Sequence, residues 1–131
     1  MSDPELLEPG VTGMWSVKDI VAHVTVWEEE ALHHLPAVLA GRRPPRYSVT
    51  HGGINAFNAK MTEQHRALPL AEVLRRRDDT HRRLVAFIQR VPESECGGDT
   101  RVRRRLRLDT YGHYAVHTNA IRTWRERRAS A

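Results

Sequence analysis

Apolar residues recur at intervals of three and four along most of the chain, which is the period of an amphipathic helix rather than of a strand. The first such stretch predicts a helix over residues 16–41, and Ser16 with Asp19 forms a Ser-x-x-Asp capping box at its start. Two later stretches predict helices over residues 54–67 and 70–91. The pattern therefore predicts an all-α chain.

The C-terminal part of the chain gives a less uniform pattern. Residues 101–108 alternate arginine with apolar residues, which fits either an extended segment or the lead-in to a helix. Asp109 is then expected to cap a last helix over residues 109–127. Proline and glycine mark the linkers, and the sequence contains no internal repeat or hairpin signal. We expect a single domain over residues 1–131, arranged as an antiparallel helical bundle.

Two histidines share one face of the predicted last helix. At about 100° per residue, His113 and His117 fall in the same arc as Trp124, and this is the only apolar arc available there. Both imidazoles are therefore expected to point into the bundle. His23 lies at the flank of the apolar stripe of the first long helix and would add a third inward imidazole. Such a set can converge on one divalent metal ion.

An aspartate stands one helical turn before two of these histidines. Asp19 precedes His23 by four residues, and Asp109 precedes His113 by four. Each carboxylate could accept the second ring N–H of its histidine and so fix the tautomer. The alternative is that both aspartates only cap their helices. A buried pair of histidines can also be a hydrogen-bonded core feature, so spacing alone leaves metal binding open.

The predicted helix over residues 70–91 carries further candidates. Its apolar arc also contains Arg77 and His81, which would supply an anion clamp and an acid or base near the ion if they face inward. The alternative is that Arg77 pairs with a neighbouring carboxylate and that His81 lies at the surface edge. Tyr111 could orient a substrate, with aromatic packing as the alternative.

Composition narrows the function classes. The chain has eight histidines, a net charge of +5 and a single cysteine, Cys96, which excludes a disulfide scaffold. Charged residues or histidines interrupt every apolar stretch, so we expect no membrane span or secretory signal and a cytoplasmic location. The arginines of residues 101–107 could contact nucleic acid. Aromatic interleaving and a known reader motif are absent, however, so a solvated basic face is the simpler interpretation.

Segments near the N-terminus and near the C-terminus of the sequence resemble those of the DinB/YfiT-like metalloenzymes. Taken together, they are most similar to the ClbS/DfsB four-helix-bundle branch. The resemblance covers most of residues 7–126. The segments that carry it are residues 7–28 (LEPGVTGMWSVKDIVAHVTVWE), 109–117 (DTYGHYAVH) and 121–124 (IRTW).

The resemblance implies an up-and-down four-helix bundle with a metal site. In metal-binding members one histidine of the second helix and two of the last, four residues apart, hold a divalent ion. Those positions correspond here to His23, His113 and His117. The implied activity is that of a metal-dependent enzyme that acts on a small electrophilic molecule by thiol transfer or hydrolysis. Imidazole-only ligation suits Zn, Ni, Fe or Cu and does not choose between them; Zn or Ni is the expected cofactor. The alternative is a metal-free, ClbS-like resistance or binding protein for a small molecule.

One feature departs from the family pattern. Family members carry a long helix ahead of the Trp-Ser-Val-Lys-Asp segment, whereas about fourteen residues, with Pro4, Pro9, Gly10 and Gly13 among them, precede it here. We therefore expect an N-terminally shortened bundle that lacks the first helix. Either the start of the sequence is misplaced or truncated, or another subunit covers the exposed groove, since an uncovered bundle face would be a large apolar patch; we expect self-association as a homodimer.

Overall fold

The computed structural model describes residues 1–130, and its helices are arranged around one central helix, α2 (Val17–Leu39). Ser16 is the N-cap of α2. Its hydroxyl accepts a hydrogen bond from the backbone N–H of Asp19 at 3.1 Å, and the Asp19 carboxylate accepts one from the backbone N–H of Ser16 at 2.9 Å. These two bonds satisfy donors that the first helical turn leaves free. The predicted first helix and its capping box are confirmed.

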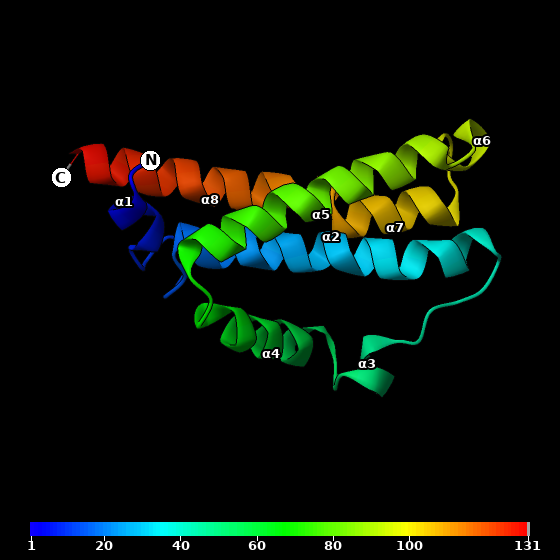
Figure 1. Ribbon diagram of the computed structural model, residues 1–131, viewed down its shortest axis with the longest axis horizontal. Coiled ribbons are helices and arrows are strands. Elements are labelled where there is room, and N and C mark those ends of the chain that lie inside the picture. The colour runs from blue at the N-terminus through cyan, green and yellow to red at the C-terminus, as the bar shows by residue number, and fades with distance from the viewer. Residues whose placement is uncertain (131) are drawn as a thin grey trace.

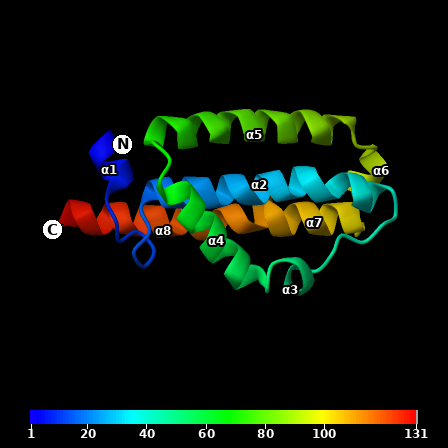
Figure 2. The same ribbon diagram turned by 60° about the horizontal axis from the view of Figure 1, so that its bottom comes forward.

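The chain runs back and forth along α2 (Figure 1). It runs in one direction in α2 and α5 (Leu70–Arg90), and it returns in α4 (Ile54–Arg66) and in α7 (Arg101–Asp109) with α8 (Tyr111–Ser130). Both α5 and α7 pack on α2, and Figure 2 shows α4 at an angle to the other helices. The expected all-α, up-and-down bundle is confirmed.

Short helices complete the described chain. Arg128 of α8 pairs with Glu5 at 3.0 Å and with Glu8 at 2.9 Å, and this holds the N-terminal residues against the C-terminal helix. Among residues 1–130, no helix combines the length and the apolar character that a membrane span requires. The short helices are α1 (Asp3–Leu7), α3 (Tyr47–Thr50) and α6 (Glu93–Cys96).

Apolar side chains of α2 form three core clusters, one with each set of neighbours. The largest joins α2 to α5 and α7, and there Ala31 and Leu35 are completely buried. A second cluster packs the start of α2 against Trp124 of α8. The third joins Trp27 to Phe57 of α4. Because partners cover α2 on several sides, it is the element against which the positions of the other helices are fixed.

The C-terminal part of the bundle differs from the sequence prediction. Residues 101–109 are helical, so this segment leads into the last helix and is not extended. The helical backbone is nevertheless interrupted at Thr110, where φ is −131° and ψ is −97°. The last helix therefore begins at Tyr111, and Asp109 ends α7 instead of capping α8. Gly112 permits this junction, because a Cβ there would lie 2.6 Å from the backbone oxygen of Arg107.

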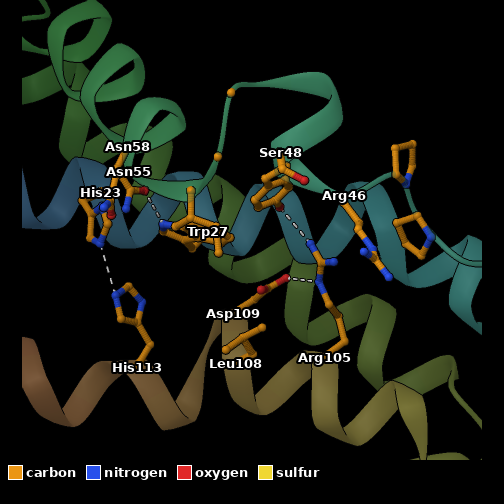
Figure 3. A pocket seen from close by; sticks show the side chains of 16 residues that line it. His23, Trp27, Arg46, Ser48, Asn55, Asn58, Arg105, Leu108, Asp109 and His113 are labelled. Carbon is orange, nitrogen blue, oxygen red and sulfur yellow. Dashed lines mark hydrogen bonds and ion pairs between the residues drawn. The ribbon is translucent and has the colours of Figure 1, made fainter.

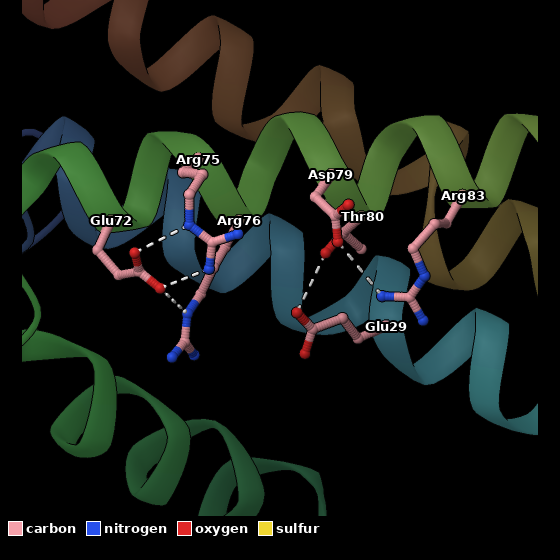
Figure 4. Close-up of polar contacts among 7 residues, drawn as sticks. All are labelled: Glu29, Glu72, Arg75, Arg76, Asp79, Thr80 and Arg83. Atoms are coloured by element: carbon pink, nitrogen blue, oxygen red, sulfur yellow. Dashed lines mark hydrogen bonds and ion pairs between the residues drawn. The ribbon is translucent and has the colours of Figure 1, made fainter.

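The exposed face of α5 is lined with ion pairs. Glu72 pairs with Arg75 at 2.7 Å and with Arg76 at 3.0 Å. Figure 4 shows both contacts on the same carboxylate. Arg77 pairs with Asp78 at 2.9 Å and is exposed, so of the two alternatives for Arg77 the one in which it pairs with a neighbouring carboxylate holds. The physical reason is that a guanidinium next to a carboxylate on a solvated face avoids the cost of burial. Much of the arginine charge on this helix is thus neutralised locally.

Candidate metal centre

Three histidine side chains from two helices meet on the inner side of the bundle. His23 extends from α2, and His113 and His117 lie one turn apart on α8. The Nε2 atoms of His23 and His113 are 3.1 Å apart, and those of His113 and His117 are 2.8 Å apart. One ligand atom from each residue falls within 4.8 Å of the others. The expectation that these three imidazoles converge is confirmed.

The spacing of these nitrogens suits a divalent ion. Two imidazole ligands of a tetrahedral zinc ion, each about 2.0–2.1 Å from the metal, lie roughly 3.3 Å apart. The two short Nε2 distances are close to that value. Two facing imidazole nitrogens can share only one proton, so Nε2 of His113 cannot satisfy both neighbours as a neutral donor. A cation between the three nitrogens would satisfy all their lone pairs, and the residues therefore fit the ion.

Burial keeps the three imidazoles in the neutral form that binds metal. Burial, with a smaller contribution from the charges of His113 and His117, lowers the pKa of His23 to about 3. Burial and the neighbouring His113 lower the pKa of His117 to about 4, and burial also lowers the pKa of His113. At neutral pH no proton competes strongly for these nitrogens.

Neither aspartate contacts the second ring nitrogen of its histidine. The Asp19 carboxylate is used in the cap of α2. Asp109 binds Arg105, and within the described chain Oδ1 of Asp109 and Nδ1 of His113 are both buried without a hydrogen-bond partner. The expected bond between Asp109 and His113 is not formed, because the backbone break at Thr110 separates the two residues into different helices. The capping alternative is correct for Asp19 alone.

A pocket of about 820 Å³ opens beside the histidine cluster (Figure 3). Its wall contains His23 and His113 at one end and Arg105 with Arg46 at the other. Trp27 forms part of the wall between them, and its indole N–H donates a hydrogen bond to the side-chain oxygen of Asn58 at 2.9 Å. This volume lies in the range of pockets that hold small molecules.

A buried polar network, which the sequence analysis did not find, forms the far end of this pocket. Arg105 donates from Nε to Asp109 Oδ2 at 2.7 Å and from Nη2 to the Tyr47 hydroxyl at 2.9 Å. The Tyr47 hydroxyl donates in turn to Glu30 at 2.9 Å. Burial raises the pKa of Asp109 to about 6, although Arg105 acts in the opposite direction. The only sequence signal is the four-residue spacing of Arg105 and Asp109, which is readable once residues 101–109 are known to be helical.

The other three candidate site residues lie outside this pocket. Arg77 and His81 line a shallow depression on α5, and Tyr111 is 48% exposed. His81 does reach inward at its Nδ1, which lies 2.9 Å from the carboxylate of buried Glu28. The hydroxyl of Tyr114 donates to the same Glu28 oxygen. His81 therefore belongs to a network between helices rather than to the wall of the pocket.

The fold and the histidine cluster agree with a comparison against known families. A model of the DinB superfamily matches residues 1–120, and the chain belongs to that superfamily. No curated protein and no solved structure matches the chain significantly.

The stability of the metal-free protein should fall as the pH drops from 7 towards 4.5. His23 and His117 have folded pKa values of about 3 and 4, whereas a histidine of the unfolded chain titrates near 6.5. Below pH 6.5 the unfolded chain thus binds protons that the folded chain does not, and this favours unfolding. Asp109 opposes the trend between about pH 6 and 3.8, because its raised pKa lets the folded state take up a proton first.

Thermal unfolding in EDTA across this pH range would measure the effect. Because two histidines outweigh one aspartate, we expect a net decrease of Tm, and His117→Gln should make the decrease smaller. A Tm that rises steadily towards pH 4.5 would contradict the neutral state of the cluster.

Proposed function

We propose that this protein is a metal-dependent enzyme of the DinB type that acts on a small electrophilic molecule. His23, His113 and His117 would hold the divalent ion. The observation that carries the proposal is the convergence of three imidazoles, two of which, His23 and His113, line one end of a pocket of about 820 Å³. An imidazole cluster buried for packing alone would have no reason to stand at the edge of such a pocket.

The three imidazole ligands determine which reactions a metal ion bound there could catalyse. Three imidazoles leave at least one coordination position for water or substrate, which is typical of a catalytic rather than a structural ion. A divalent ion bound there would lower the pKa of a water or a thiol, and so supply a nucleophile near neutral pH. Imidazole ligands suit Zn and Ni, which we propose as the cofactors. Thiol transfer and hydrolysis are the two reaction types consistent with this chemistry.

The chain itself would bind and orient the substrate. Trp27 and Leu108 offer apolar surface in the pocket, and Asn58 holds the Trp27 ring in place. None of Arg77, His81 and Tyr111 lines this pocket. A catalytic role for these three residues stays a prediction from the sequence.

A second candidate function keeps the pocket and dispenses with the metal. The pocket wall is rich in hydrogen-bonding side chains, among them Asn55, Asn58 and Arg105, which could hold a ligand without an ion. This is the function expected of a ClbS-like resistance or sequestration protein. Retained ligand binding after chelation would favour it.

We also propose that two copies of the chain associate. Tyr111 and Val116 of α8 are large side chains that are 48% and 65% exposed. Exposed apolar side chains are a common feature of interfaces. A cytoplasmic location stays a prediction from the sequence.

Elemental analysis of protein purified from metal-replete medium tests the proposal. We expect about one equivalent of a transition metal per chain. EDTA should remove it, and Zn²⁺ or Ni²⁺ added back should raise Tm, because an ion that binds only the folded state stabilises it. Protein without bound metal, and without any rise of Tm on addition of either ion, would exclude the metal-dependent enzyme.

A further inference from the structure

We propose that the end of the pocket opposite the histidines is an oxyanion site formed by Arg105 and Arg46, so that the substrate is a small acid with a carboxylate or phosphate. This inference rests on the proposed function in one respect, namely that the same pocket holds the substrate. Figure 3 shows Arg105 and Arg46 on one side, His113 and His23 on the other, and Asp109 between them.

Arg105 is held in a fixed orientation with donors to spare. Its Nε binds Asp109 and its Nη2 binds Tyr47, while Nη1 has no hydrogen-bond partner in the described part of the chain. The Arg105 side chain is 19% exposed and that of Asp109 is fully buried. The ion pair with Asp109 therefore fixes the orientation of the Arg105 side chain, and the Nη1 group of the guanidinium can donate hydrogen bonds to a ligand. A guanidinium oriented in this way loses little conformational freedom when it binds an oxyanion.

The charge around this end of the pocket is positive. Residues 44–58, which supply most of the wall, contain no aspartate, glutamate or lysine, and Arg46 is the one arginine among them. Arg46 is exposed and forms no ion pair within residues 1–130. Of the side chains that line the pocket, Arg46 and Arg105 are basic and Asp109 is the one carboxylate, so the wall carries a net positive charge; Glu30, which accepts the hydrogen bond of the Tyr47 hydroxyl, is not part of the wall. This field would attract a ligand with an acidic group.

The middle of the pocket suits an apolar body between the two ends. Trp27, Ile54 and Leu108 contribute apolar side chains to the wall. A ligand that fills the pocket would place its oxyanion at Arg105 and its opposite end at the histidines. The substrate class is therefore a small, partly apolar acid whose electrophilic centre lies away from its acidic group.

Binding of benzoate and of phenyl phosphate to the EDTA-treated protein at pH 8 tests this assignment. Calorimetry or quenching of tryptophan fluorescence can follow binding, because Trp27 lines the pocket. Benzamide, which has the same ring without the charge, should bind at least about tenfold more weakly than the anions, since a charged hydrogen bond contributes roughly 1.5–3 kcal/mol. The tighter of the two anions would distinguish a carboxylate site from a phosphate site.

Three variants separate this site from general charge effects. Asp109→Asn should strengthen benzoate binding, because it removes the carboxylate that competes for Arg105 but keeps an acceptor. The double variant Arg105→Gln with Asp109→Asn should weaken binding about tenfold or more, without a buried unpaired charge. Arg46→Gln, at an exposed position that should not affect folding, should weaken it by a smaller factor. Arg107→Gln is the control, because Arg107 is exposed on the same helix and lies outside the pocket.

The outcomes distinguish this inference from the proposed function. Equal binding of benzoate and benzamide, or benzoate binding that neither Arg46→Gln nor the double variant changes, would overturn the oxyanion site. Metal content of the same samples is measured separately. Selective anion binding by a protein that holds no metal would support the oxyanion site and contradict the metal-dependent enzyme.

Discussion

His113→Ala should abolish stoichiometric metal binding. Nε2 of His113 is the nitrogen that lies close to both of the others, at 3.1 Å from His23 and 2.8 Å from His117. Its loss leaves two imidazoles, from different helices, and two such ligands hold an ion far less tightly than three do. Loss of a residue that merely supports a ligand typically costs 10–100-fold in affinity, so loss of this ligand should cost about 100-fold or more.

The measurement is a competition titration with a zinc indicator, supported by elemental analysis. His33→Ala is the matched control, because His33 lies on α2 like His23 but is exposed and outside the cluster. The control should bind metal as the wild type does. Equal zinc affinity of His113→Ala and the wild type would show that the ion, if bound, is held elsewhere.

The sequence predicted this cluster because each histidine lies on a helix whose register could be determined. The capping box at Ser16 and Asp19 places the start of α2, and the apolar stripe then orients His23. His113 and His117 are both beyond the helix break, so an error in the start of the last helix did not alter their spacing. Periodicity works here because it needs only local geometry.

The failures have equally local causes. Arg77 falls on the apolar arc of α5 by angle, but the long side chain can turn back to Asp78, and a helical wheel contains no information on that choice. The oxyanion end of the pocket depends on Tyr47 of the short helix α3 and on Arg105 of α7, residues that are 58 positions apart in the sequence. Long-range contacts of this kind depend on how linkers fold over the bundle, which periodicity does not describe.

Gly112→Ala should destabilise the protein, although the same change on an exposed helix normally stabilises it. Alanine is favoured over glycine in a helix by up to about 1 kcal/mol. At Gly112, however, the new Cβ would lie 2.6 Å from the backbone oxygen and 2.8 Å from Cγ of Arg107. The side chain could move, but the carbonyl belongs to the last turns of α7. Overpacking of this kind costs roughly 1–3 kcal/mol, so we expect a net loss of stability.

The same clash should weaken metal binding, because Gly112 immediately precedes His113 at the junction that positions α8. Urea unfolding of the metal-free variant would measure the stability, and a zinc titration would measure the affinity. Ala115→Gly is the matched control on the exposed side of α8. It should lose about 1 kcal/mol through helix propensity alone and keep its zinc affinity. A Gly112→Ala protein more stable than the wild type would mean that α7 and α8 do not meet as closely as the break at Thr110 requires.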